Sequence, residues 1–215
     1  MKKRIFIFSA LLLCLPVFAF AHQPRLVESN VIEVAAPEVS KAYYARLTSE
    51  PHLYRIQSDV PFQLYVNLLI PDLPDAKKDV SAAVLKEGDL NHPLALLGGP
   101  EATWKSFHEE FGDDNYLQTA EFKQEAPAGV YEVRVWSSNN DSAYVLAIGE
   151  KEEFSPKEIL SALSVMPRIK ETMFRKPWYS AYLTPFVLPK LVMTGLALLA
   201  VIVVIVLLVR RRKRA

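Results

Sequence analysis

Histidine 22 is the residue of this 215-residue chain with the clearest potential for metal chemistry. If the chain is cut after Ala21, His22 becomes the N-terminal residue and offers an α-amino group and an imidazole together. This pair chelates Cu(II) when a second imidazole comes from elsewhere in the fold. The other histidines are His52, His92 and His108, and none has ligand spacing with another. Copper binding at His22 is therefore one hypothesis, and a solvated N-terminus without a function is the alternative.

An acidic segment around position 112 is the second candidate metal site. It contains Glu109, Glu110, Asp113 and Asp114. Carboxylate oxygens at this density can bind Ca²⁺, although the spacing does not fit an EF-hand loop. We therefore expect a solvated acidic loop, with a structural Ca²⁺ held by Asp113 and Asp114 as the alternative. No other cofactor is indicated.

No catalytic motif is present in the sequence. It contains no Gly-x-Ser-x-Gly elbow, no His-Glu-x-x-His helix and no glycine-rich phosphate loop. Two carboxylates in a cleft could still hydrolyse a glycoside, so an orphan envelope hydrolase is kept as an alternative. The prediction is a protein that is not an enzyme.

Three aromatic residues could line a face that binds a sugar or a peptide. These are Trp104, Tyr116 and Trp136. Aromatic side chains present a large apolar surface with a polar atom, which suits such ligands when they are exposed. In a small domain the same residues more often fill the core, and this is the alternative.

Both ends of the chain carry targeting or membrane signals. Lys2, Lys3 and Arg4 precede an apolar run and a small-residue motif ending at Ala21, which is typical of a secretory signal peptide over residues 1–21. The alternative is an uncleaved N-terminal anchor. The single cysteine, Cys14, would leave with the signal peptide, so the mature chain would form no disulfide.

Residues 191–209 are 19 consecutive uncharged residues, mostly apolar. A helix of this length spans roughly 28 Å, close to the thickness of the bilayer hydrocarbon. Arg210, Arg211 and Arg212 begin a basic tail over 210–215. The positive-inside rule places this tail in the cytoplasm and the preceding domain outside the cell membrane.

Between these ends, residues 22–152 show the period-two alternation of strands. The clearest strand is 62–70, which we expect to be buried on one face. Segments 129–137 and 144–148 flank a turn at 138–141 and predict a hairpin, with Tyr131, Val133 and Val135 facing inward. Weaker strands are expected at 31–34, 42–47, 53–56, 82–86 and 94–97. Seven or eight short strands predict a mainly β fold, an antiparallel, jelly-roll-like β-sandwich.

Residues 153–190 have a different character. Ser155, Pro156 and Glu158 form a helix N-terminal signature, and apolar residues recur at helical spacing from Ile159 and Leu160 to about 174. This amphipathic helix is expected to pack on the sandwich or, alternatively, to lie along the bilayer. Residues 175–190 form a connector whose predicted membrane-interface residues are Trp178, Tyr179, Tyr182 and Lys190.

The segment 126–135, Ala-Pro-Ala-Gly-Val-Tyr-Glu-Val-Arg-Val, followed by Ala143 to Ile148, resembles the closing hairpin of bacterial pre-peptidase C-terminal β-sandwich domains. The resemblance covers about 25 residues and implies a fold more than a function. The layout of the whole chain also resembles a group of uncharacterised single-pass envelope proteins of bacteria and archaea. The resemblance to that group implies no activity.

The charge distribution narrows the choice of partner. Residues 22–187 contain 24 acidic and 16 basic residues, a net charge of −8. This sign disfavours binding to nucleic acid. The predicted function is a membrane-anchored, extracytoplasmic binding or scaffolding domain for another envelope protein or a surface glycan. The alternatives are copper handling through His22 and envelope hydrolysis.

Overall fold

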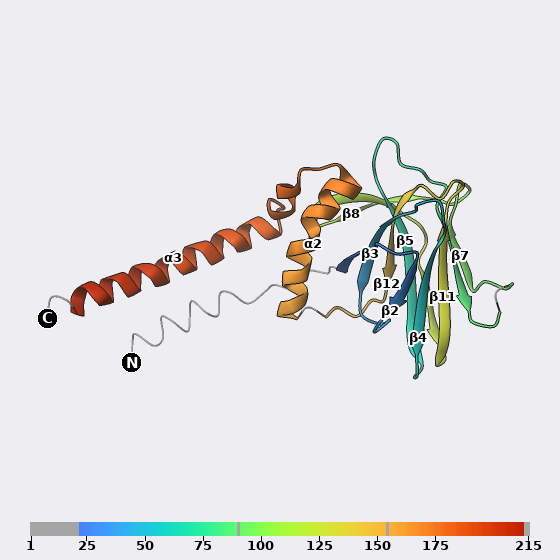
Figure 1. Cartoon of the computed structure of the whole chain (residues 1–215), viewed down its shortest axis with the longest axis horizontal. Helices are drawn as coiled ribbons and strands as arrows, with labels where there is room; N and C mark the ends of the chain where they lie inside the picture. The colour runs from blue at the N-terminus through green and yellow to red at the C-terminus, as the bar shows by residue number, and fades with distance from the viewer. Residues whose placement is uncertain (1–21, 90, 154, 213–215) are drawn as a thin grey trace.

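A computed structural model describes residues 22–89, 91–153 and 155–212. The predicted signal peptide and the last residues of the predicted tail, 213–215, lie outside the described residues. The described chain folds into a mainly β domain followed by two α-helices, and the second helix extends away from the domain (Figure 1).

Two mixed sheets build the domain. Sheet A contains β1 (Gln23–Leu26), β3 (Lys41–Arg46), β12 (Ala143–Ile148), β5 (Phe62–Pro71), β9 (Asp114–Gln118) and β8 (Lys105–Glu109) in that order, with β10 (Phe122–Ala126) paired to β5. Sheet B contains β2 (Val31–Val34), β4 (His52–Ser58), β11 (Gly129–Trp136), β6 (Ser81–Lys86) and β7 (Ala95–Gly98) in that order. Side chains of both sheets form one buried core between them, as in a β-sandwich.

The prediction of purely antiparallel sheets is wrong at two edges. Strand β1 pairs with β3 in parallel, and β2 pairs with β4 in parallel. From β1 to β6 the chain enters the other sheet with each new strand. When the chain also reverses its direction each time it passes to the other sheet, a strand and the next strand of the same sheet, such as β1 and β3, run in the same direction. Parallel pairs therefore arise without any crossover helix.

The predicted hairpin between 129–137 and 144–148 is also wrong. Strand β11 belongs to sheet B and β12 belongs to sheet A, so the turn between them crosses from one sheet to the other. Asn140 shapes this turn with a positive φ of 48° and accepts a hydrogen bond on its side-chain oxygen from the Ser137 backbone N–H, at 3.0 Å. The inward residues were predicted correctly, because Tyr131, Val133 and Val135 are all buried in the core between the sheets.

Strand β5 is buried on both faces, whereas one buried face was predicted. Phe62, Leu64 and Val66 point into the core between the sheets. Tyr65 and Leu69 point the other way, into a second apolar cluster on the outer side of sheet A. Helix α2 (Pro156–Phe174) covers that outer side, which explains why the strand has no solvated face.

Helix α2 begins where the sequence indicates. Ser155 is its N-cap and accepts a hydrogen bond from the Glu158 backbone N–H, at 3.2 Å. Met166 and Ile169 pack on sheet A, so the helix lies against the sandwich as expected. Leu160 departs from the predicted apolar stripe, because it is exposed on the opposite side of the helix.

The rest of the chain leads away from the domain. A short 3₁₀ helix, η1 (Trp178–Tyr182), follows α2 and is followed by α3 (Val187–Arg212), which has 26 residues. Helix α3 is long and apolar enough to cross a membrane. Its last residues include Arg210, Arg211 and Arg212.

Candidate interaction surface

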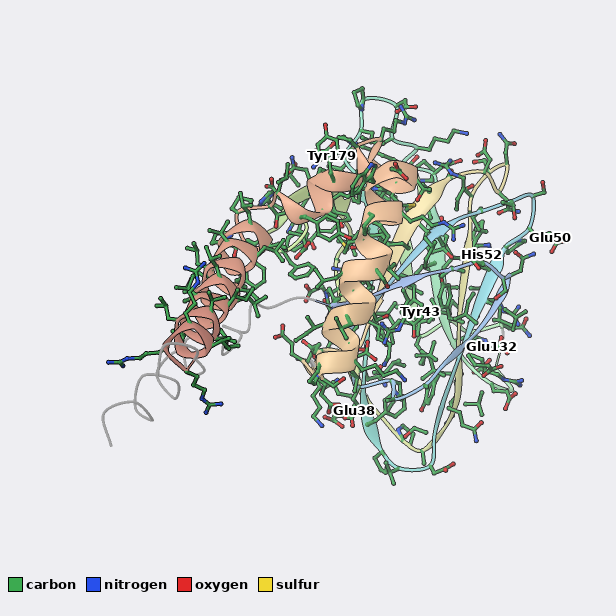
Figure 2. All side chains as sticks on the ribbon, turned by 60° about the vertical axis from the view of Figure 1, so that its left-hand side comes forward. Glu38, Tyr43, Glu50, His52, Glu132 and Tyr179 are labelled. Atoms are coloured by element: carbon green, nitrogen blue, oxygen red, sulfur yellow. The ribbon has the colours of Figure 1, made fainter. Side chains whose placement is uncertain are left out.

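The two sheets differ in what covers their outer sides. Helix α2 packs on the outer side of sheet A, and α3 leaves the domain on the same side (Figure 1). Neither described helix contributes to the packing of sheet B. In Figure 2, Glu132 of sheet B lies on the side of the domain opposite α3. The outer side of sheet B is therefore covered by neither described helix and faces away from α3, although Ala83, Leu85 and Glu132 on its central strands are buried.

A row of side chains crosses this open side from edge to edge. Strand register aligns Val31 with Leu53, Leu53 with Arg134, Arg134 with Ala83, and Ala83 with Leu96. Each of these residues alternates with an inward neighbour, so all five project outward. Val31 is 57% exposed and Leu96 is 68% exposed. The row is apolar except for Arg134 at its centre.

A second row beside it carries opposite charges. Glu33 aligns with Arg55, Arg55 with Glu132, and Glu132 with Leu85. Glu132 is only 8% exposed, and its carboxylate accepts hydrogen bonds from Nη2 and Nε of Arg134 at 2.8 and 3.2 Å. Such an ion pair fixes the direction of the Arg134 side chain. We call Val31, Leu53, Leu96, Glu132, Arg134 and Trp136 the open face.

Of the three aromatic residues predicted to bind a ligand, only Trp136 lies on the open face. It is half-buried and aligns with Ser81 at the end of β11. Trp104 packs against the core between the sheets and donates its indole N–H to the Gly99 carbonyl at 3.3 Å. Tyr116 is buried beneath α2, where its hydroxyl lies 3.0 Å from that of Tyr44. The three residues therefore do not form one ligand face, and Tyr116 belongs to the core.

The acidic segment contains a buried ion cluster. Asp114 is 0% exposed, and its two oxygens lie 2.7 Å from Lys170 Nζ and 2.8 Å from Lys176 Nζ. Asp113 has a left-handed backbone and lies 3.5 Å from His108 Nε2. The structure therefore does not bring Asp113 and Asp114 together as ligands, since both oxygens of Asp114 already contact ammonium groups.

Glu109 completes this cluster. Its carboxylate accepts hydrogen bonds from the backbone N–H groups of Phe111 and Gly112, at 2.8 and 2.7 Å. Burial raises the pKa of Glu109, and burial lowers the pKa of Lys170 against the opposing effect of Asp114. The cluster joins the β8–β9 turn to α2. The expectation of a solvated acidic loop is therefore wrong at Asp114, which is buried.

The histidines do not assemble into a metal site. His22 Nδ1 contacts the Ser40 hydroxyl, His52 Nδ1 lies 2.8 Å from the Tyr144 hydroxyl, and His92 Nδ1 lies 2.7 Å from Asp89. Within residues 22–89, 91–153 and 155–212, no group of three or more histidines and carboxylates is placed to hold a metal ion. None of these three contacts joins His22 to another histidine, and copper binding at His22 stays a prediction.

One pocket contains the paired carboxylates that the hydrolase alternative requires. Asp75 and Asp141 line a cavity of about 170 Å³. Asp75 lies 2.7 Å from Arg175, and Asp141 lies 2.5 Å from Lys77. The hydrogen bond from Arg175 lowers the pKa of Asp75, which keeps this carboxyl ionised and unsuited to donate a proton.

Comparison with known proteins does not identify the chain. No family model matches it, and no curated protein matches it with significance. The pre-peptidase C-terminal domain of a Bacillus anthracis collagenase has 13% identity over 58% of this chain and 96% of that chain, with a TM-score of 0.34. That domain belongs to the family that segment 126–148 resembles.

Two further solved structures are similar to part of this chain. CorA, a surface-associated copper-binding protein important in copper acquisition by Methylomicrobium album BG8, has 9% identity over 58% of this chain and 98% of that chain, with a TM-score of 0.29. A β-glucosidase from Paenibacillus barengoltzii has 10% identity over 60% of this chain and 13% of that chain, also with a TM-score of 0.29. Likenesses this weak support no conclusion about function.

Most of the open face was not predicted from the sequence. The outward positions of Glu132 and Arg134 follow from the alternation in 129–137. The alignment of Val31, Leu53 and Leu96 with Arg134 depends on four strand pairings, and no local pattern in the sequence contains that information.

Proposed function

We propose that this chain is a non-catalytic binding domain, anchored in the cell membrane by α3, that presents the open face of sheet B to another protein of the cell envelope. The domain is extracytoplasmic in this proposal. The basic residues Arg210, Arg211 and Arg212 follow the apolar part of α3 directly, which favours a cytoplasmic C-terminus.

The observation that carries the proposal is the open face itself. Val31 and Leu96 are large apolar residues, both more than half exposed, at the two ends of one row of aligned residues. Within the row Leu53 and Arg134 are partly exposed and Ala83 is buried. Arg134 lies at the centre of that row with its guanidinium held by Glu132. Apolar contacts around an ordered arginine are typical of the energetic centre of a protein–protein interface.

A protein partner fits this face better than a glycan. Sugar-binding faces are built on exposed aromatic platforms, and Trp136 is the one aromatic residue on the open face and is half-buried. Membrane anchoring concentrates the domain in two dimensions, so even a modest affinity for a neighbouring membrane protein would be effective.

Site-specific photo-crosslinking in native membranes tests the proposal. Benzoylphenylalanine is placed at position 31 or 96 of the full chain, and at Val60 as a control. Val60 is 62% exposed, similar to Val31 and Leu96, but lies in the β4–β5 turn. We expect one discrete crosslinked protein band from positions 31 and 96 and none from position 60. Equal labelling from all three positions, or no discrete band, contradicts the proposal.

A further inference from the structure

The connector between the domain and α3 is packed against the domain and is not a free tether. The Tyr182 hydroxyl donates to the Leu163 carbonyl of α2 at 3.1 Å. The ring of Phe186 lies 5.3 Å from that of Phe111 in the β8–β9 turn. Ala181 and Thr184 are buried, and Val187, the first residue of α3, is 6% exposed. The start of α3 is therefore part of the domain surface.

The distance from this packed point to the membrane is short. The uncharged apolar run begins at Leu191, four residues after Val187. Four helical residues rise about 6 Å. The polar headgroup layer on each side of a bilayer is also roughly 5–7 Å thick. A domain surface that buries Val187 must then lie within the headgroup layer, if α3 spans the membrane.

The residues that reach this layer have the chemistry of the membrane interface. Trp178 is 54% exposed and Leu183 is 56% exposed, and Tyr179 between them is half-exposed. Figure 1 shows η1 on the side of the domain from which α3 leaves, and Figure 2 labels Tyr179 near the end of α2 at the same side. Tryptophan and tyrosine are enriched at the level of lipid headgroups.

Two of the three basic residues of this region are already paired with acidic residues of the domain. Arg175 lies 2.7 Å from Asp75, and Lys176 lies 2.8 Å from Asp114. Lys190 is the third, and its Nζ donates to the Phe186 carbonyl at 2.9 Å and lies over the Phe186 ring. A single unpaired ammonium group attracts anionic lipid weakly, so the contact depends mainly on the aromatic and apolar side chains. A leaflet of zwitterionic lipid is therefore sufficient for this contact.

We infer that the domain rests directly on the outer leaflet of its own membrane, with Trp178, Tyr179 and Leu183 embedded in the headgroup layer. This inference depends on the membrane anchoring proposed above. It adds a fixed orientation, because the contact at η1 and the packed start of α3 hold the domain with the open face directed away from the bilayer.

Nitroxide depth measurements on the full chain in phosphatidylcholine nanodiscs test this inference. Single labels are attached to Tyr179→Cys, Leu96→Cys and Leu198→Cys in a Cys14→Ser background. The accessibility of each label to oxygen and to a water-soluble nickel complex gives its depth. We expect the label at 198 in the hydrocarbon, the label at 179 in the headgroup layer and the label at 96 in water. Replacing about a third of the lipid by phosphatidylglycerol should leave the depth at 179 unchanged.

The outcomes separate the two proposals. A label at 198 in hydrocarbon with a label at 179 in water leaves the anchor intact and overturns the seated domain. A label at 198 in water overturns the anchor and the seated domain together. A label at 96 in the headgroup layer overturns the inferred orientation. Quenching by brominated lipid gives an independent measurement, since Trp178→Phe should remove most of the quenching of wild-type tryptophan fluorescence.

Discussion

Lys170 Nζ lies 2.7 Å from Asp114 Oδ2, and both side chains are almost fully removed from solvent, with 1% and 0% exposed. The two residues join helix α2 to strand β9 of sheet A. Removing one partner of a buried ion pair leaves an uncompensated charge, which costs more than the pair contributes. Together with the apolar packing of Met166 and Ile169, this contact therefore holds α2 on sheet A, and through α2 it contributes to the position of η1.

Asp114→Asn should destabilise the domain by about 3–5 kcal/mol, the range for breaking a buried ion pair. Two ammonium groups, those of Lys170 and Lys176, then face a neutral amide. Lys170→Met should cost less, because Lys176 continues to neutralise Asp114. Denaturant unfolding of the purified full chain in detergent measures both changes. Equal stability of Asp114→Asn and wild type would show that the cluster does not hold α2.

Buried His52 should make the domain sensitive to acid. Burial lowers the pKa of His52 from its ordinary value of 6.5, and its Nδ1 lies 2.8 Å from the Tyr144 hydroxyl. Below pH 6.5 the unfolded chain binds a proton that the folded chain resists, so stability is lost as the pH falls through this region. The loss is at most about 1.4 kcal/mol per pH unit for one group.

His52→Gln should flatten this dependence between pH 7.5 and pH 5, roughly the range in which histidine titrates. Thermal unfolding at a series of pH values measures the difference from wild type. His92→Gln serves as the matched control, because His92 is exposed and should follow wild type. The explanation fails if the profile of His52→Gln parallels that of wild type.

The alternation of apolar and more polar residues predicted β5 and β11, and strands without this alternation were missed. Strand β11 was recognised because Tyr131, Val133 and Val135 are buried between more polar residues. Strand β8 was missed because Lys105–Glu109 is exposed along nearly its whole length. Strand β9 was missed because its first buried residue is Asp114, whose charge is compensated by lysines far away in the sequence.

Which strands pair was harder to predict from the sequence than which segments form strands. The same inward pattern in β11 and β12 fits a hairpin or a crossing between sheets, since both arrangements bury Tyr131 and Tyr144 in one core. The open face depends on how the strands of sheet B pair with one another. Trp136 was predicted as a binding residue, but its neighbours across the sheet follow from strand register alone.

The orientation of the chain in the membrane gives a separate prediction. A cysteine at Leu96→Cys, in a Cys14→Ser background, should react with a membrane-impermeant maleimide in intact cells. A cysteine at Ala215→Cys should react only after the cells are permeabilised, because the basic residues at the end of α3 favour the cytoplasm. The reverse pattern of labelling would place the domain inside the cell and exclude an extracytoplasmic partner.

Leu96→Glu should weaken partner binding without weakening the fold. The side chain is 68% exposed at the end of the apolar row, so a charge there remains solvated in the free domain. Surface substitutions of this kind change stability by about 0.5 kcal/mol or less. Burying the same charge in an interface is costly, and photo-crosslinking from position 31 should fall by at least about tenfold, which corresponds to about 1.4 kcal/mol. Val60→Glu is the matched control, because Val60 is similarly exposed but lies off the open face, and it should leave crosslinking unchanged. If Leu96→Glu and Val60→Glu reduce crosslinking equally while both variants fold with wild-type stability, the open face is not the partner's binding site.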